Sequence, residues 1–373
     1  MSDLGRLSSP HASRRDVLRW TGGGLLALGV GGALSACGGG GSNSAAGVKK
    51  AAGALSKPTT LHIASAPIDN YFLDFVNQDQ QDYQKYNLEV PKFILPKSGV
   101  QGEQLMTAGS IDAQVQDVLL TMSTFVHSEP GKRPVFVGMR VPETTYSIVV
   151  GKGSWPDAKA SFQEKMQALK GKTIGVTAIG AGADQQLTLA LKQAGMTRKD
   201  VTPLAVGQVA GGGAAQMKAG RIAAYVGITW ATSRVLAKQT GGRILIEFSD
   251  PSVPPLLSKQ QVDVCIVRED FAKKHEDVVK AWLASQTAGR DWMVANRGKA
   301  AELLNKTCLG GKFPDIAKGY IDHFADDLVP KLHPDWKVAK ADIDVMLDVA
   351  QQMGIIKKGQ ISFEDLVPAF ARA

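Results

Sequence analysis

The sequence predicts an α/β fold with two lobes, in which each lobe is a mostly parallel sheet flanked by helices. The chain has 373 residues, more than one hydrophobic core usually organises, so two domains are expected. Segments with the alternating pattern of strands take turns with segments of helical pattern, which is typical of α/β sheets. Residues 106–115 recur as residues 217–226 with six of ten positions identical, which indicates two lobes built on one plan.

The first 37 residues are predicted to be an export signal. Arg14, Arg15 and Arg19 precede an apolar run that ends at Cys37, and residues 13–19 resemble a twin-arginine signal. Residues 34–37 resemble a lipobox, so we expect Cys37 to carry a lipid. The alternative is a membrane span, but the run is shorter than the roughly 20 residues that a span needs and is diluted by glycine.

Residues 38–57 are rich in Gly, Ser and Ala and are expected to form a flexible tether. Four of the 43 basic and two of the 35 acidic residues lie in residues 1–36, which leaves a net charge of +6 for the rest. No run of Lys and Arg is dense enough for a nucleic-acid partner, and the mild positive charge at most favours an anionic ligand. Cys265 and Cys308 allow one disulfide, although Cys265 fits better as a small buried strand residue.

The order of the expected strands and helices divides the chain into two lobes and a C-terminal segment. Lobe 1 is expected over residues 58–143, lobe 2 over 144–259, and residues 260–373 return to lobe 1 and add C-terminal helices. The expected strands are residues 61–67, 173–179 and 262–267, with two more after the glycines of the repeated segment. The expected helices are residues 102–108, 184–194, 214–219, 269–296, 341–353 and 362–371. The alternative is that the two copies of the repeated segment are similar by chance, because both are helix-to-strand turns.

Common catalytic and cofactor motifs are absent from the sequence. Residues 170–173 end like a P-loop, but Met166 stands where a glycine is needed and the segment leads into a strand. Residues 180–185 begin like a dinucleotide fingerprint, but Gln185 replaces the third glycine. There is no nucleophile elbow, no paired cysteine motif and no metal-binding histidine spacing. We therefore expect no enzyme activity, no cofactor and no metal.

The candidate ligand site lies where strands end. In open α/β sheets ligands bind beyond the C-terminal ends of the strands, and four loops qualify: residues 66–72, 116–118, 178–184 and 227–230. The repeat makes the second and fourth loops equivalent, so we expect them to face each other across a cleft. The candidate ligand-binding residues in these loops and at the lobe junction are Pro67, Asn70, Tyr71, Gln116, Asp117, Thr145, Gly180, Ala181, Gly182, Asp184 and Trp230.

Each candidate also has a structural interpretation. The glycine-rich loop 178–184 before a helix is an expected anion-binding nest, or a tight turn in which Asp184 caps the helix. Trp230 is expected to form an apolar wall for the ligand with Tyr71 opposite, or both rings belong to the core. Gln116 and Asp117 bind the ligand or cap the following helix.

Four motifs, in their order and spacing, resemble a known family: residues 61–63, 108–113, 169–176 and 219–224. They are similar to the nitrate, sulfonate, taurine and thiamine-pyrimidine-precursor family of ABC-transporter substrate-binding proteins. The resemblance implies a type II periplasmic-binding fold that closes on a small, anionic or heterocyclic solute. It also implies a monomer in the cell envelope that delivers this solute to permease subunits with a cytoplasmic ATPase. A ligand-sensing receptor and a pyrimidine-biosynthesis enzyme of the same fold are the alternatives.

Overall fold

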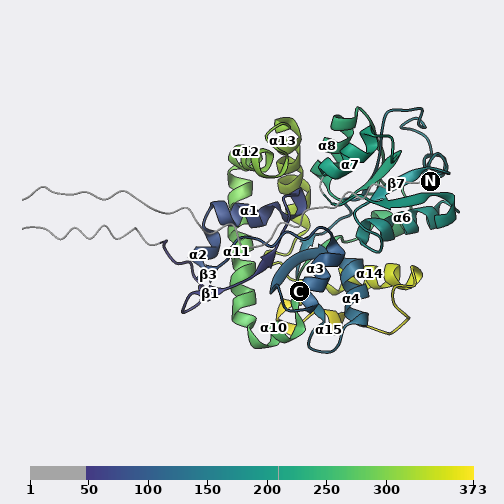
Figure 1. The fold of residues 1–373 in the computed structure, drawn as a ribbon. Helices are drawn as coiled ribbons and strands as arrows, with labels where there is room; N and C mark the ends of the chain where they lie inside the picture. The colour runs from purple at the N-terminus through teal and green to yellow at the C-terminus, as the bar shows by residue number, and fades with distance from the viewer. Residues whose placement is uncertain (1–47, 209) are drawn as a thin grey trace, which may run out of the picture. The chain divides into compact units, whose positions relative to one another are not determined.

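The computed structural model describes residues 48–208 and 210–373. Residues Val48–Ala373 form one compact unit (Figure 1). The predicted export signal, the predicted lipidation site Cys37 and the first part of the tether lie outside the described residues. No helix of the described part is both long enough and apolar enough to cross a membrane.

The sheet of lobe 1 has four strands, in the order β2 (Ile63–Ala64), β4 (Ala113–Asp117), β11 (Asp263–Arg268) and β5 (Pro134–Val141). β2 pairs in parallel with β4, whereas β11 runs antiparallel to β4 and β5. Every residue of β4 and β5 is buried. A short parallel pair, β1 (Thr59–Thr60) and β3 (Leu88–Glu89), accompanies this sheet.

The sheet of lobe 2 has five strands, in the order β10 (Arg243–Glu247), β6 (Ser147–Val150), β9 (Ala224–Gly227), β7 (Thr173–Val176) and β8 (Thr202–Ala205). β7 is parallel to both β8 and β9, and β6 is antiparallel to β9 and β10. The two-lobed α/β fold is confirmed, but the sheets are mixed rather than mostly parallel. The reason is that a strand entering a lobe directly from the other lobe, such as β6 or β11, needs no crossover helix and can pair antiparallel.

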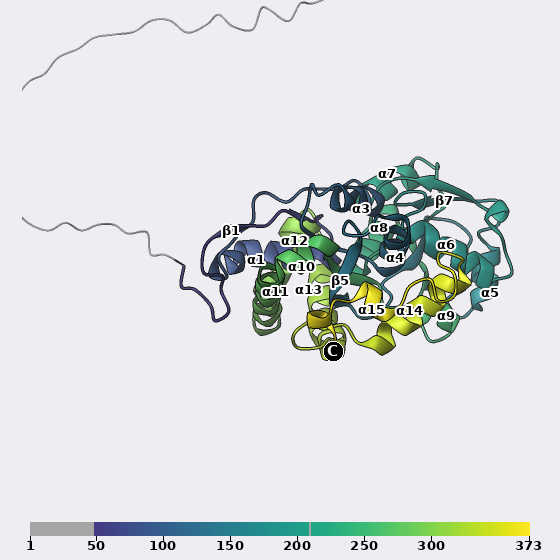
Figure 2. The ribbon, with the colours of Figure 1, turned by 90° about the horizontal axis from the view of Figure 1, so that it is seen from below.

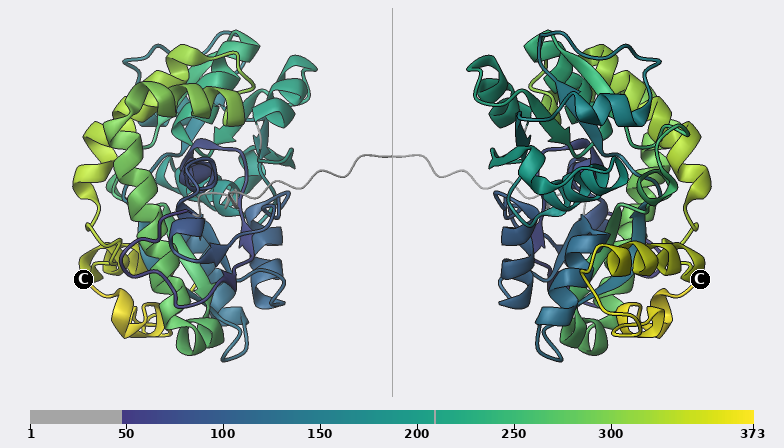
Figure 3. Two further views of the ribbon diagram at one scale, coloured as in Figure 1. Left: turned by 90° about the vertical axis from the view of Figure 1, so that its left-hand side faces the viewer. Right: turned by 90° about the vertical axis from the view of Figure 1, so that its right-hand side faces the viewer.

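The chain passes between the two sheets twice. The first crossing is the segment 142–146 between β5 and β6, and the second is the segment 248–262 between β10 and β11. The boundaries expected at residues 144 and 260 fall inside these crossings. Figure 3 shows the two lobes with green helices of the last third of the chain running along one side of both.

Fifteen α-helices flank the sheets in the described part of the chain. They are α1 (Phe72–Asp79), α2 (Asp82–Lys85), α3 (Gly99–Thr107), α4 (Val118–His127), α5 (Phe162–Gln167), α6 (Gly182–Gln193), α7 (Ala210–Lys218), α8 (Trp230–Thr240), α9 (Pro255–Ser258), α10 (Glu269–Lys274), α11 (Glu276–Ala295), α12 (Arg297–Cys308), α13 (Pro314–His323), α14 (Lys340–Gln352) and α15 (Phe363–Leu366). Both copies of the repeated segment run from a helix through a glycine turn into a strand, at Gly109 and Gly220, each with a positive φ. The repeat is thus one structural unit used twice.

Two expected helices are interrupted. The predicted helix 269–296 divides into α10 and α11 at His275, because Lys273 and Lys274 favour a helix end and Glu276 and Asp277 favour a new start. The predicted helix 362–371 stops after α15 because Pro368 follows it. Cys265 and Cys308 are both free thiols.

The C-terminal helices contact both lobes. α12 packs on α1, and α13 packs on α8. α14 packs on α4 of lobe 1, and its Gln352 carbonyl accepts a hydrogen bond of 2.8 Å from Lys192 of α6 in lobe 2. In Figure 2 α14 lies in yellow beside α9 and α6. The C-terminal helices therefore bridge the two lobes through the α12–α13 pair and through α14.

A candidate solute site between the lobes

A narrow cavity lies between the two sheets. Its lining comes from both lobes: Ile68, Asn70, Tyr71, Gly99, Gln116, Asp117, Leu120, Tyr146, Thr177, Ala181, Gly182, Ala183, Gln208, Ile228, Thr229, Val262 and Asp263. Its volume is about 30 Å³, far below the roughly 300–1,000 Å³ of ordinary ligand pockets. An organic solute therefore enters only when the lobes move apart.

Asp117 of lobe 1 lies against the first residue of α6 in lobe 2. Its Oδ1 accepts a 2.8 Å hydrogen bond from the Leu120 amide, so it caps α4, and its Oδ2 accepts a 2.7 Å bond from the Tyr146 hydroxyl. A Cβ on Gly182 would be 2.8 Å from Asp117 Cγ and 2.3 Å from Tyr146 Oη. Only glycine allows the lobes to approach this closely.

Asp69 makes the second contact between the lobes. It lies just after β2, and its carboxylate accepts hydrogen bonds from the Ala231 amide at 2.6 Å and from the hydroxyls of Thr229 and Thr232. These donors form the first turn of α8, which has no cap from its own N-cap side chain. A lobe 1 carboxylate thus caps a lobe 2 helix, where both the free amides and the helix dipole favour a negative charge.

The two contacts between the lobes pair loops that are not equivalent in the repeat. The loop after β4 meets the loop after β7, and the loop after β2 meets the loop after β9. We expected the equivalent loops, 116–118 and 227–230, to face each other, and the structure replaces that pairing with a crossed one. A two-fold relation between repeated units produces this pairing. When the first loop of one unit contacts the second loop of the other unit, the second loop of the one also contacts the first loop of the other.

Asp263 and Asn70 complete the polar lining. Asp263 is the register partner of Asp117, and its Oδ2 accepts a 2.6 Å hydrogen bond from Asn70 Nδ2. Burial, and then the charge of Asp117, raise the pKa of Asp263 to about 7. Burial also raises the pKa of Asp117. Thr145 joins the lobes here, because its hydroxyl accepts from Asn70 and donates to the Ile228 carbonyl.

In the predicted anion nest at residues 178–184, a carboxylate of the loop itself stands where an anion was expected. Gly180 has a φ of +80°, and its amide donates to Asp184 Oδ2 at 2.9 Å. Asp184 Oδ1 accepts a 2.7 Å bond from Arg198. Ala181 and Gly182 line the cavity, but Gly180 and Asp184 do not. The loop is therefore a tight turn held by Asp184, and the carboxylate that lies against Gly182 at the start of α6 is that of Asp117.

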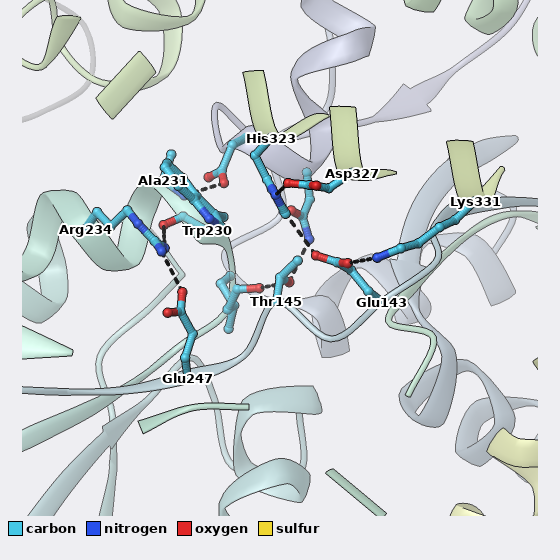
Figure 4. Close-up of polar contacts among 12 residues, drawn as sticks. Glu143, Thr145, Trp230, Ala231, Arg234, Glu247, His323, Asp327 and Lys331 are labelled. Atoms are coloured by element: carbon cyan, nitrogen blue, oxygen red, sulfur yellow. Dashed lines mark hydrogen bonds and ion pairs between the residues drawn. The ribbon is translucent and has the colours of Figure 1, made fainter. Parts of the chain in front are cut away.

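Trp230 is not among the residues that line this cavity. Its ring stacks on His323 (Figure 4) with 5.6 Å between the ring centroids, and the Arg234 guanidinium lies 3.6 Å from the centroid of the Trp230 ring. The expectation of a tryptophan wall is corrected, because the first residue of α8 turns toward α13. Pro67 also lies elsewhere, at a cavity of about 300 Å³ beside Cys308.

His323 links the first crossing to the C-terminal helices (Figure 4). Its Nε2 forms an ion pair of 3.0 Å with Glu143, and its Nδ1 bonds to Asp327 at 2.8 Å. Lys331 also pairs with Glu143. Burial lowers the pKa of His323, but its partners Glu143 and Asp327 raise it more, so the net shift is upward. This cluster fixes the segment that enters lobe 2.

Several lining residues were missed from the sequence. Asp263 starts β11 and Tyr146 precedes β6, and each lies at the same edge as the ends of the parallel strands because β11 and β6 are antiparallel. Gln208 also lines the cavity, and its amide donates to the Pro96 carbonyl of lobe 1 at 2.8 Å. An acidic residue among the first positions of an expected strand, as Asp263 is in residues 262–267, is the signal that would have found it.

Comparison with solved structures shows the fold. The chain is similar to the alkanesulfonate-binding protein SsuA from Xanthomonas axonopodis pv. citri bound to MOPS, with a TM-score of 0.63, 16% identity and coverage of 84% of this chain and 99% of that one. It is also similar to the periplasmic aliphatic sulphonate binding protein SsuA from Escherichia coli, with a TM-score of 0.58, 18% identity and coverage of 85% and 92%.

The periplasmic nitrate-binding protein NrtA from Synechocystis PCC 6803 gives a TM-score of 0.53 at 16% identity, with coverage of 68% of this chain and 66% of that one. No curated protein matches the sequence significantly. A family model described as NMT1/THI5 like matches residues 74–300. This match covers more than half of the sequence and confirms the resemblance found in the motifs. The chain belongs to the NMT1/THI5-like family.

Proposed function

We propose that the chain is the extracytoplasmic solute-binding component of an ABC importer. It captures a small organic solute between its lobes and delivers it, as a monomer, to permease subunits driven by a cytoplasmic ATPase. The observation that carries the proposal is the cavity lined by both lobes and closed to about 30 Å³. A site of this kind holds a solute only while the lobes are together and releases it when they part.

The contacts across the cavity support reversible closure. Asp69, Asp117, Thr145 and Gln208 join the lobes by hydrogen bonds and close packing, and none of these contacts is covalent. Family membership and the fold shared with sulfonate-binding and nitrate-binding proteins support the same function.

Native mass spectrometry tests this function on full-length protein purified without denaturation. We expect a folded monomer that carries one small molecule in part of the population, and the mass of that molecule after release identifies it. A protein that never carries a solute, and whose thermal midpoint no metabolite fraction raises, would contradict the function.

We also propose that the protein is exported by the twin-arginine route and anchored by a lipid on Cys37, as residues 13–19 and 34–37 indicate. We expect Cys37→Ser to abolish incorporation of labelled fatty acid, because the serine hydroxyl does not replace the thiol that receives the lipid. The measurement is acyl labelling in the producing cell. Labelling of Cys37→Ser at the wild-type level would refute the anchor and leave the solute-binding function untouched.

A further inference from the structure

The cavity between the lobes is acidic. Asp117 and Asp263 both line it, they are 6% and 5% exposed, and no Lys, Arg or His is among its described lining residues. The buried Arg140 lowers the pKa of Asp263, but it is not among the residues that line the cavity. Its Nη1 donates to Gln286 and its Nε donates to the backbone carbonyl of Asn70. The two carboxylates therefore have no positive side chain beside them in the cavity.

Asn70 provides a second and independent indication. The residue lines the cavity and is 4% exposed. Its Nδ2 donates to Asp263, which fixes the orientation of the amide, and its Oδ1 is buried without a hydrogen-bond partner among the described residues. A buried acceptor without a donor costs about 1–3 kcal/mol. A solute that supplies an N–H donor would remove this cost.

Two tyrosines add to the same preference. Tyr71 and Tyr146 line the cavity beside Asp117 and Asp263, and the Tyr146 hydroxyl is already engaged by Asp117. Aromatic rings attract cations through their electron-rich faces. Carboxylates, an amide oxygen and aromatic rings are the groups that together recognise a protonated amine.

We propose, on the basis of the solute-binding function above, that the solute is an organic ammonium ion whose N–H groups donate to Asp263, Asp117 and the Oδ1 of Asn70. An anion would instead be desolvated beside two carboxylates. A metal ion is a poorer occupant, because no group of three or more His, Cys, Asp or Glu side chains in residues 48–208 and 210–373 is placed to hold one. The mild positive net charge of the chain at most favoured an anionic ligand, and the lining of the cavity reverses that preference.

The test compares probes that differ only in their charged group. Linear primary amines, the alkanesulfonates of the same chain lengths and the corresponding alcohols are added to the full-length protein, and the thermal midpoint and calorimetric affinity are measured. We expect amines to raise the midpoint, and sulfonates and alcohols to leave it unchanged. Asp263→Asn and Asp117→Asn should each weaken amine binding about tenfold or more, because each removes a charged acceptor. The matched control is Asp335→Asn, an exposed carboxylate with no side-chain partner in the described structure.

Asp263→Asn has a second readout that separates a lost site from a lost fold. The pKa of Asp263 is about 7, well above that of an unfolded aspartate, so the ionised form destabilises the folded state at pH 8. We therefore expect Asp263→Asn to raise the thermal midpoint at pH 8 without any probe while it weakens amine binding.

Three results would overturn the ammonium assignment: stabilisation by sulfonates, no stabilisation by any amine, or amine binding that persists in both cavity variants. Stabilisation by a sulfonate would leave the solute-binding function standing, since it reverses only the charge of the solute. Absence of every solute in both this panel and native mass spectrometry would count against the function itself.

Discussion

Gly182→Ala is expected to weaken solute binding roughly ten- to hundredfold. The added Cβ would lie 2.3 Å from Tyr146 Oη and 2.8 Å from Asp117 Cγ, so the lobes cannot close as they do in the structure. Overpacking of this kind costs about 1–3 kcal/mol, and in a closing protein the cost falls on the bound state. Calorimetry with the solute identified by native mass spectrometry measures the affinity, and small-angle X-ray scattering measures the opening of the lobes.

The matched control is Gly298→Ala. Gly298 also lies in the first turn of a helix, α12, and nothing lies within 4 Å of an added Cβ. Alanine favours a helix over glycine by about 1 kcal/mol at either position, so a loss seen only for Gly182→Ala cannot come from a weakened helix. Equal affinity and equal scattering for the two variants would mean that the lobes do not need this close approach.

Asp69→Ala is expected to lower the free energy of unfolding by about 2–4 kcal/mol. The substitution removes the cap of α8, a loss worth about 0.5–2 kcal/mol, and leaves the buried hydroxyls of Thr229 and Thr232 without their acceptor, which costs about 1–3 kcal/mol. Equilibrium unfolding in urea, followed by circular dichroism, measures the change.

Two further variants show where the effect of Asp69 arises. Asp69→Asn keeps one side-chain oxygen as an acceptor and should recover part of the lost stability. Asp335→Ala removes an exposed aspartate and should change the free energy of unfolding by less than about 0.5 kcal/mol. If Asp69→Ala cost no more than Asp335→Ala, the contact between Asp69 and α8 would contribute nothing to the fold.

The sequence predicted the parts of the fold that local patterns determine. The glycine turns at Gly109 and Gly220 and the strands that follow them are confirmed, because helix periodicity, a positive φ and strand alternation are all visible within ten residues. The direction of β6 and β11 was not predictable in this way. The direction of a strand depends on the route of the chain between the lobes, and this route cannot be predicted from the pattern of a short segment.

The same reasoning explains which of the expected candidates line the cavity. The candidates in its lining are Asn70, Tyr71, Gln116, Asp117, Ala181 and Gly182, and each was chosen because it lies at or after the C-terminal end of a parallel strand. Asp263 and Tyr146 were missed because they precede antiparallel strands at the same edge. Trp230 was expected at the ligand site because it follows β9. In the structure the ring of Trp230 stacks instead on His323 of α13. A contact between residues more than 90 positions apart, such as Trp230 and His323, cannot be anticipated from the local pattern.

The cap that Asp69 provides for α8 has a consequence for transport. Because this contact involves no solute, it favours the closed arrangement whether or not cargo is bound. The apparent affinity is the intrinsic affinity multiplied by the fraction of molecules already competent to bind tightly, so a stronger cap improves capture. A cap strong enough to keep most molecules closed would also keep cargo out and present empty carriers to the transporter. The strength of one carboxylate-to-helix contact is therefore bounded on both sides: it must be weak enough to let cargo enter and strong enough to retain it until delivery.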